Sequence, residues 1–323
     1  MSAEVGIWGA AGALALAGSL WMGAALPGGG YVTAPDGGGR QPGTLLGPGC
    51  DRVPAERARV ASAALITDEI LLELLPEQRW ESVSYVVDLP RVSPVSGRFA
   101  PELFRTAGTA EHLFRLNADR ILLSEYNNAA TLPHLASGGR CVIQVAAPHT
   151  VDELLGTIVW VGQVTGTLPR AVKLHQRLAL QVSRWPSPPE AQRPRALILQ
   201  GLMTYAPGTL QHDCLRRAGL RNVAEELGLK GAPHLGSEIL LRVEVDVLFV
   251  AAPVERPRPA TLSELPGGVL WDDSYVARRG HILLVPGTWT GSLSHHALRA
   301  GEAVAEAARR GPGRLASDNR EKN

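Results

Sequence analysis

The sequence predicts an α/β protein of two similar lobes with mainly parallel sheets, joined by a single long helix. Two observations carry this prediction. Apolar strand-like runs alternate with amphipathic helical runs twice along the chain, as in parallel sheets that helices cover. Between the two series lies one long helical run, 168–186, which the prolines of 186–194 bring to an end.

A repeated residue pattern supports the similarity of the lobes. Glutamate is followed four residues later by arginine and after four more by aspartate, at Glu111, Arg115, Asp119 and again at Glu238, Arg242, Asp246. Each copy leads into an apolar run of strand character. The two copies therefore mark corresponding helix–strand units. The apolar positions, Leu113 and Leu116 in one lobe and Leu240 and Val243 in the other, are expected to face a sheet, and the glutamates are expected to face solvent.

The elements of the first lobe, 57–167, follow in a regular order. The run 59–65 predicts a strand, and the helix after it, 67–75, has Thr67 as its N-cap and acidic residues in its first turn. The other elements expected in this lobe are strands at 80–88, 119–124 and 140–147 and helices at 110–118, 131–139 and 150–166.

The second lobe, 193–310, repeats the alternation after the connecting helix. Its expected strands are 195–200, 245–252 and 281–286, and its expected helices are 209–220, 236–244 and 294–310. The polar end, 311–323, lacks apolar periodicity and is predicted to be a disordered tail.

The N-terminal part differs from both lobes. Residues 7–26 hold no charge over twenty positions, which predicts a signal peptide or an N-terminal anchor within 1–26 and a periplasmic or otherwise extracytoplasmic protein. The Gly/Pro-rich segment 27–56 is expected to be a flexible linker. Cys50 lies far from the apolar run, so lipid attachment at Cys50 is the weaker alternative.

Charge and cysteine content argue against a nucleic-acid-binding protein and against a disulfide-rich protein. The formal net charge is +1 with no long run of one sign, which argues against a nucleic-acid partner. Three cysteines are too few for a disulfide framework. Cys141 and Cys214 are expected to be small buried or half-buried residues, and a bridge between them stays open as an alternative.

Four stretches resemble the substrate-binding proteins of ABC importers, of the class whose lobes are joined by one rigid helix. RVASAALITDEILLEL resembles the opening strand and Thr-Glu-Ile-Leu helix of that family, and VSYVVDLP its next strand. AEHLFRLNADRILL resembles the Glu-x-x-x-x-Leu-x-Pro-Asp-Leu-Val unit, with Ala118 in place of proline. MTYAPGTLQHDCLRRAGLRNVAEE resembles a segment of the second lobe, its glycine pair reduced to Ala218-Gly219. The resemblance covers roughly 57–310.

This resemblance implies a monomeric binding protein rather than an enzyme. Its ligand would be cobalamin or another corrinoid, haem or a ferric siderophore, its partners an ABC permease and ATPase, and no resident cofactor or metal is expected. The ligand would lie between the lobes, in loops after the C-terminal ends of strands. Candidate ligand-binding residues there are Tyr85, Asp88, Tyr126, Asn127, Tyr205, Thr209, Trp271 and Trp289. In the family one surface glutamate of each lobe docks onto the permease, and the resemblance places these on Glu111 and Glu238.

Simpler interpretations stand beside these. Glu111 and Glu238 also fit ordinary i,i+4 helix pairs with arginine, and Trp271 and Trp289 fit caps over each lobe's core. Arg91 and Arg98 suit either anionic ligand groups or solvent. His295 and His296 lack zinc-ligand spacing and are expected to be solvated. The alternative functions are a two-lobed α/β enzyme with a cleft site and a sensor or carrier without transport; no G-x-S-x-G, P-loop or paired-cysteine motif is present.

Overall fold

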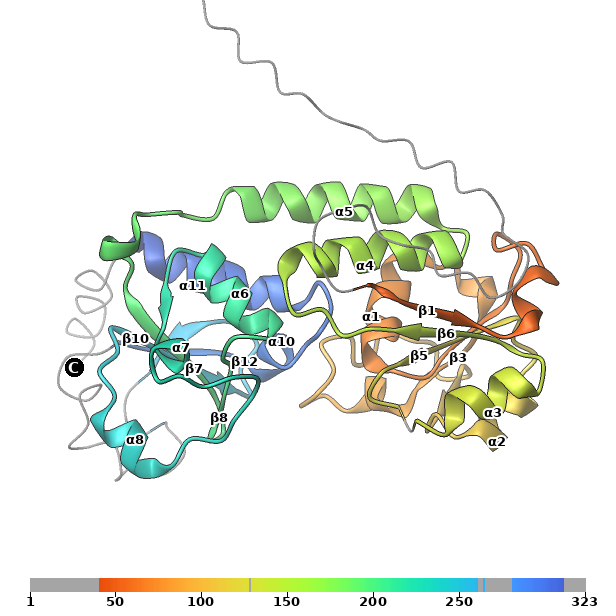
Figure 1. The fold of residues 1–323 in the computed structure, drawn as a ribbon, viewed down its shortest axis with the longest axis horizontal. Coiled ribbons are helices and arrows are strands. Elements are labelled where there is room, and N and C mark those ends of the chain that lie inside the picture. The colour runs from red at the N-terminus through yellow and green to blue at the C-terminus, as the bar shows by residue number, and fades with distance from the viewer. Residues whose placement is uncertain (1–40, 128, 261–263, 265–280, 311–323) are drawn as a thin grey trace, which may run out of the picture.

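The computed structural model describes residues 41–127, 129–260, 264 and 281–310. In this part of the chain, two six-stranded sheets form two lobes, and the long helix α5 (Leu168–Ser183) lies beside both (Figure 1). The predicted fold class, two mainly parallel α/β lobes joined by one long helix, is confirmed. The predicted signal or anchor, 1–26, the predicted tail, 311–323, and Trp271 lie outside the described residues.

The sheet of the first lobe has the strand order β1-β6-β5-β2-β3-β4, and all pairings are parallel except that of β1 with β6. Its strands are β1 (Gly43–Leu46), β2 (Val60–Ser62), β3 (Trp80–Ser84), β4 (Phe104–Thr106), β5 (Arg120–Ser124) and β6 (Cys141–Val145). The helices of this lobe are α1 (Leu65–Leu74), α2 (Ala110–Arg115), α3 (Thr131–Ser137) and α4 (Val151–Val164).

The sheet of the second lobe has the order β11-β12-β10-β7-β8, with β9 also paired to β7. Its parallel centre is β12-β10-β7, and β8 and β11 are antiparallel additions. The strands are β7 (Arg195–Gln200), β8 (Met203–Thr204), β9 (Arg221–Asn222), β10 (Val247–Ala252), β11 (Arg258–Pro259) and β12 (His281–Pro286). The helices are α6 (Leu210–Arg217), α7 (Val223–Glu226), α8 (Ser237–Arg242), α10 (Gly287–Thr290) and α11 (Ala297–Arg310).

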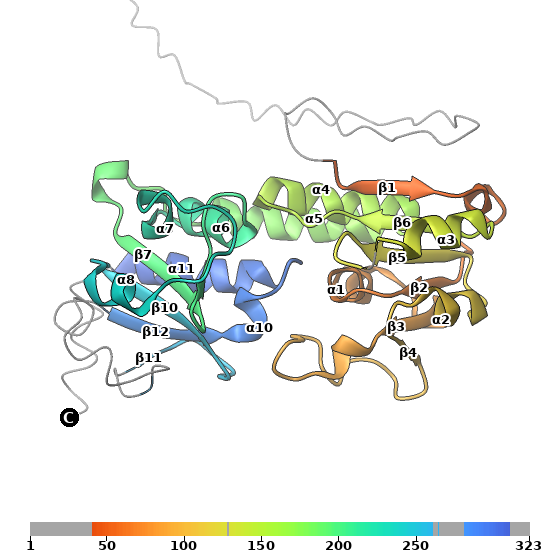
Figure 2. The same cartoon turned by 60° about the horizontal axis from the view of Figure 1, so that its bottom comes forward.

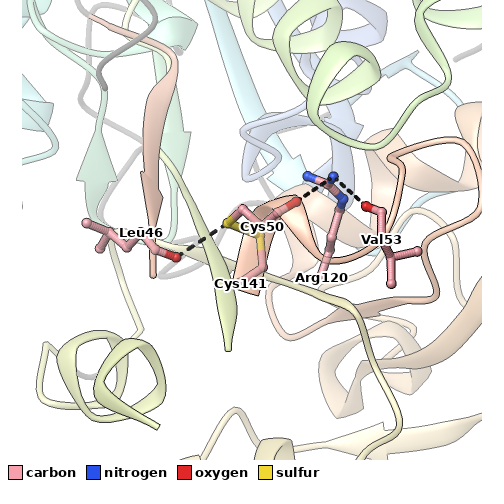
Figure 3. Close-up of a disulfide and its surroundings, with 5 residues drawn as sticks. All are labelled: Leu46, Cys50, Val53, Arg120 and Cys141. Carbon is pink, nitrogen blue, oxygen red and sulfur yellow. Dashed lines mark hydrogen bonds between the residues drawn. A yellow bond between two sulfur atoms is a disulfide. The ribbon is translucent and has the colours of Figure 1, made fainter. Parts of the chain in front are cut away.

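Part of the segment predicted as a linker, 27–56, is instead ordered against the first lobe. Strand β1 pairs with β6, and the 3₁₀ turn Pro48–Asp51 follows it. Arg120, at the start of β5, donates to the carbonyls of Cys50 and Val53 at 3.2 and 3.3 Å (Figure 3). The linker prediction was wrong here because an edge strand gains its backbone partners from β6, which the Gly/Pro content of the segment does not show.

A disulfide joins Cys50 to Cys141, the first residue of β6 (Figure 3). Both alternatives considered from the sequence are therefore wrong: Cys50 is not a free thiol for lipid attachment, and Cys214 is buried in the other lobe as an unpaired thiol. No local pattern indicates this pairing, because the two cysteines are 91 residues apart. The antiparallel pairing of β1 with β6 is what brings Cys50 to the start of β6.

Helix α1 begins earlier than its acidic first turn suggests. Ala64 is the N-cap, so the prediction of Thr67 as N-cap was wrong. The Thr67 hydroxyl donates back to the Ala64 carbonyl at 2.8 Å and bonds the Ser62 hydroxyl at 2.6 Å, so it joins the helix to the end of β2. The predicted strand 80–88 is also shorter, because the 3₁₀ turn Tyr85–Asp88 replaces its second half.

The repeated pattern has a structural role through its aspartates. The carboxylate of Asp119, just before β5, accepts from the backbone N–H of Arg59 at 2.7 Å, and the Asp119 N–H donates to the Arg59 carbonyl at 2.9 Å. Asp246, just before β10, makes the same two bonds with Arg195, both at 2.8 Å. Each aspartate therefore fixes the start of the central parallel pair of its lobe, β2–β5 or β7–β10.

One cluster of buried apolar side chains continues from lobe to lobe beneath α4 and α5. It contains Val60 and Ile143 of the first sheet, Leu174 of α5 and Phe249 of the second sheet. Polar contacts fasten the same region: Asp213 of α6 accepts from the N–H of Val151, the first residue of α4, at 2.8 Å. The lobes are thus packed together and not merely tethered.

Removal of the disulfide tests how far it stabilises the first lobe. The double variant Cys50→Ser/Cys141→Ser should lose about 2–4 kcal/mol of unfolding free energy, because the unfolded chain regains the freedom of a long loop. Urea unfolding followed by circular dichroism measures this loss. Reductant should destabilise the wild type by the same amount and leave the double variant unchanged. Equal stability of the wild type and the double variant without reductant would contradict the prediction.

Candidate functional site

A cavity of about 280 Å³ lies between the two lobes. Most of its wall comes from the first lobe, from segments that follow β2, β3, β4 and β5. The second lobe contributes the turn after α10. The described residues that line it are Ala63, Ala64, Leu65, Ile66, Glu69, Ser84, Tyr85, Val86, Thr106, Ala107, Ser124, Tyr126, Asn127, Gly291, Ser292 and Leu293.

The topology explains why these segments meet. Strands β2, β3, β4 and β5 are parallel neighbours, so their carboxyl ends lie at one edge of the sheet, which faces the second lobe (Figure 2). The carboxyl edge of a parallel sheet is the usual place for a ligand site in α/β proteins. The sequence predicted a site in these loops, and the cavity lies there.

Three of the predicted ligand-binding residues line this cavity. Tyr85 begins the 3₁₀ turn after β3 and is 53% exposed, and Tyr126, after β5, is 69% exposed. Asn127 is held in place by its turn, because its side-chain oxygen accepts from the Ser124 N–H at 2.7 Å and its amide donates to the Ala63 carbonyl at 3.1 Å. The cavity therefore has two exposed aromatic rings beside a fixed amide.

The structure does not bring the other predicted ligand-binding residues to this cavity. Asp88 is exposed and paired with Arg105 at 2.8 Å, and the Arg105 guanidinium holds the pKa of Asp88 below its usual value. Thr209 caps α6 and donates to the Ala206 carbonyl. Tyr205 is buried in the core and its hydroxyl donates to Gln200.

Trp289 lies outside the interlobe cavity as well. It packs against the core, with the Arg299 guanidinium 5.8 Å from its ring centre, and lines a second cavity beside α11. This arrangement matches the simpler interpretation of Trp289 as a cap over the core. Trp271, the last predicted contact, lies outside the described residues.

Two adjacent acidic residues of α1, Asp68 and Glu69, are buried, and Glu69 lines the cavity; neither was among the predicted site residues. Glu69 crosses the interlobe boundary: its Oε2 accepts from Ser292 at 2.7 Å and from Ser294. Asp68 stays within the first lobe and accepts from the backbone N–H and the hydroxyl of Ser84. The available signal was two adjacent acids in a helix of mostly apolar residues, but acidic residues are also common in the first turn of a helix, where they interact with its dipole.

Burial dominates the protonation of this acidic pair. It raises the pKa of Asp68 to about 7, against the bonds from Ser62 and Ser84. It raises the pKa of Glu69 to about 7 too, against the serine hydroxyls and with a further contribution from the charge of Asp68. Both carboxyls therefore titrate near neutral pH.

The histidine pair after the cavity turn is buried, so the expectation of solvated side chains was wrong. His295 and His296 are 6% and 3% exposed, and their ring centres lie 4.3 Å apart. Desolvation lowers the pKa of His295 to about 4 and that of His296 to about 2, so both are neutral near pH 7. They are buried because the turn before α11 packs inside the interlobe region. Within the described ranges, no three His, Cys, Asp or Glu side chains gather as metal ligands.

The two glutamates of the repeated pattern occupy equivalent places. Glu111 is the second residue of α2 and Glu238 the second residue of α8, both helices have six residues, and both glutamates are exposed. The two helices lie along the edge of the molecule opposite α5, one on each lobe (Figure 1). Neither glutamate lines the interlobe cavity.

Solved structures with the same architecture exist. The periplasmic haem-binding protein HutB of Vibrio cholerae matches with a TM-score of 0.60 at 19% identity, covering 77% of this chain and 97% of that one. This chain has the fold of the periplasmic solute-binding proteins. The periplasmic vitamin B12-binding protein BtuF of Vibrio cholerae (TM-score 0.58, 17% identity) covers 77% of this chain and 96% of its own.

A third similar structure binds a different kind of ligand. The molybdate-binding protein MolA of a Haemophilus influenzae ABC transporter has a TM-score of 0.58 at 17% identity and covers 84% of this chain and 93% of its own. No family model matches the sequence, and no curated protein matches it. The similarity therefore establishes the fold, and one fold serves haem, vitamin B12 and molybdate in these proteins. Among the residues that the structure describes, no helix has the length and apolarity of a membrane span.

The buried acidic pair contributes stability that is lost as pH rises, whereas the buried histidines, whose pKa values are lowered, contribute with the opposite sign. The folded protein keeps the protons of the two carboxyls up to about pH 7, whereas the unfolded chain loses them near pH 4. At these two carboxyls the folded state binds more protons between these values, so the contribution of each to the free energy of unfolding should fall by about 3 kcal/mol as pH rises from about 4 to about 7. Urea unfolding at several pH values measures this slope. Relative to the wild type, Asp68→Asn and Glu69→Gln should each make the free energy of unfolding rise more, or fall less, with pH over this range, and Glu111→Gln, at an exposed site, should leave the slope unchanged; identical slopes in all four proteins would refute the assignment.

Proposed function

We propose that this protein is the substrate-binding component of an ABC importer and that it holds its ligand between the two lobes. The observation that carries the proposal is the interlobe cavity, at the carboxyl edge of a parallel sheet, with the exposed rings of Tyr85 and Tyr126 beside it. The ligand class is a metal chelate or macrocycle: cobalamin or another corrinoid, haem or a ferric siderophore. Exposed aromatic rings suit the flat or partly apolar faces of such ligands.

The size of the cavity limits how such a ligand fits. About 280 Å³ is at the lower end of small-molecule sites, so the described cavity would take one edge or side group of a macrocycle. The rest of the ligand would lie against the tyrosines at the cleft. We propose that the protein binds this ligand without catalysing a reaction, and such a role accounts for these features.

The disulfide supports a location outside the cytoplasm. Structural disulfides form and persist in oxidising compartments such as the periplasm, and Cys50–Cys141 joins two elements of the first lobe. The uncharged run 7–26 suits an export signal or an anchor for the same location. We propose an extracytoplasmic monomer that meets its permease and ATPase at the membrane.

Ligand titration tests this function. Protein produced with residues 1–26 intact is purified, its visible spectrum and the mass of any bound compound are recorded, and it is titrated with cyanocobalamin, haemin and ferric siderophores. Tyr85→Ala and Tyr126→Ala should each weaken binding of the compound that binds by about 1–2 kcal/mol, about five- to thirtyfold, because a buried aromatic contact is lost. Trp289→Phe, at the other cavity, is the matched control and should bind normally. Unchanged affinity in both tyrosine variants would place the ligand elsewhere.

Glu111 and Glu238 are proposed to dock onto the permease, one from each lobe. Their equivalent positions on α2 and α8, exposed and away from the cavity, support this role. Glu111→Lys and Glu238→Lys should each leave ligand affinity near normal and reduce uptake in a cell-based import assay at least tenfold, because like charges at a docking site cost several kcal/mol. Glu225→Lys, an exposed reversal on α7, serves as the control. Full uptake by the doubly reversed protein would show that the two glutamates only stabilise their helices.

A further inference from the structure

The charge of the cavity wall is unusual for a site that is to hold a chelate. Among the described residues that line it, Glu69 is the only acidic one, and none is lysine, arginine or histidine. The remaining polar groups are hydroxyls and one amide: Ser84, Thr106, Ser124, Ser292, the two tyrosines and Asn127. An anionic ligand would therefore find hydrogen-bond donors here but no cation.

Glu69 is held so that its charge acts on this space. The residue is 1% exposed, and the bonds from Ser292 and Ser294 both end on Oε2. Its other oxygen, Oε1, is buried and has no hydrogen-bond partner in the described part of the chain. The Coulomb interaction of a buried carboxylate with a nearby ligand charge is weakly screened, so it reaches the ligand without direct contact.

We propose that Glu69 makes the interlobe cavity selective for cationic or neutral chelates and against anionic ones. This inference rests on the proposed binding function and assigns the charge class of its ligand. A cationic group in the cavity is attracted by the ionised carboxyl, and an amide-bearing neutral ligand is tolerated. An anionic carboxylate or catecholate complex is repelled, or it binds only if Glu69 takes up a proton.

In the described part of the chain, the groups around Glu69 do not cancel its charge. On its own helix, Asp68 is a second acid, and the cavity wall near it carries the phenol hydroxyls of Tyr85 and Tyr126. In the second lobe His295 and His296 are neutral because of desolvation.

The described cations on neighbouring elements do not line the cavity. Arg105 is bound to Asp88 at 2.8 Å, and Arg98 is an exposed residue whose charge acts on His296. Arg299, on α11, lies over the ring of Trp289. Arg91, like Arg98, is exposed and outside the lining, so the structure does not give either arginine to an anionic ligand group at this cavity.

This charge selectivity makes ligand binding depend on pH, because the Glu69 carboxyl releases or takes up a proton when a charged ligand binds. Burial places the pKa of Glu69 at about 7 in the ligand-free protein. A cationic ligand favours the ionised carboxyl, so its binding releases a proton below that pH and strengthens as pH rises. An anionic ligand favours the protonated carboxyl, so its binding takes up a proton above that pH and weakens as pH rises.

The experiment compares four probes of different charge. Ferrioxamine B is cationic through a free ammonium group, cyanocobalamin is neutral and rich in amides, and haemin and ferric enterobactin are anionic. Dissociation constants are measured by fluorescence and calorimetry near pH 6 and near pH 8, in two buffers of different ionisation enthalpy so that proton release is counted. The wild type should bind ferrioxamine B or cyanocobalamin at least tenfold more tightly than either anionic probe. Glu69→Gln should reduce that ratio at least tenfold.

The matched control is Asp68→Asn, which removes the adjacent buried acid. Asp68 bonds Ser84 of the cavity wall but does not itself line the cavity, so this variant should retain most of the ratio. The proton count on the wild type needs no variant, so it decides the matter even if Glu69→Gln fails to fold. Tighter binding of haemin or ferric enterobactin by the wild type, or an unchanged ratio in a folded Glu69→Gln protein, overturns the selectivity and leaves the binding function intact. Binding of none of the four probes overturns both.

Discussion

The apolar core that runs without interruption from one lobe to the other is the constraint on which the rest of the structure depends. It holds Ile143 and Phe249, from different sheets, in one cluster with the inner face of α5. Hydrogen bonds lie at its boundary: the N–H at the start of α4 donates to Asp213, and the indole N–H of Trp185 donates to Glu302. Two lobes joined only by a flexible linker would not keep such bonds. Because the lobes share this core, the space between their sheet edges has a defined shape.

That fixed space explains why two acids can be buried at it. Burying a carboxyl is costly unless it is hydrogen-bonded or protonated, and Asp68 and Glu69 are both hydrogen-bonded and raised in pKa. The bonds of Glu69 to Ser292 and Ser294 need the second lobe at one position. The core thus supplies the geometry, and the carboxyl supplies the charge of the site.

The similar structures set the frame for the ligand without choosing it. Proteins that bind haem, vitamin B12 and molybdate share this fold with the chain at 17–19% identity. What separates them must lie in the side chains at the cleft, since a fold supports many sites. In this chain those side chains are Tyr85, Tyr126, Asn127 and the carboxyl of Glu69, and their chemistry is the basis of the proposed ligand class.

The sequence by itself determined the two-lobed α/β class and the connecting helix, because apolar periodicity is local and survives without tertiary information. It also predicted that Tyr85, Tyr126 and Asn127 lie at the sheet edge, where they line the cavity, because they follow the ends of strands by one to three residues. The places of two other predicted residues were beyond it: Thr209 is a helix cap and Tyr205 a core residue, since packing decides which way a loop side chain turns.

Tertiary structure alone decided the contacts that join distant parts of the chain. Cys50 pairs with Cys141 because β1 adds to the sheet edge at β6, and Glu69 meets Ser292 across 223 residues because the lobes share a core. The aspartates of the repeated pattern were visible in the sequence, but their bonds to Arg59 and Arg195 follow only from the parallel pairing of strands. Local patterns specify elements, whereas such pairings depend on where the packed elements finally lie.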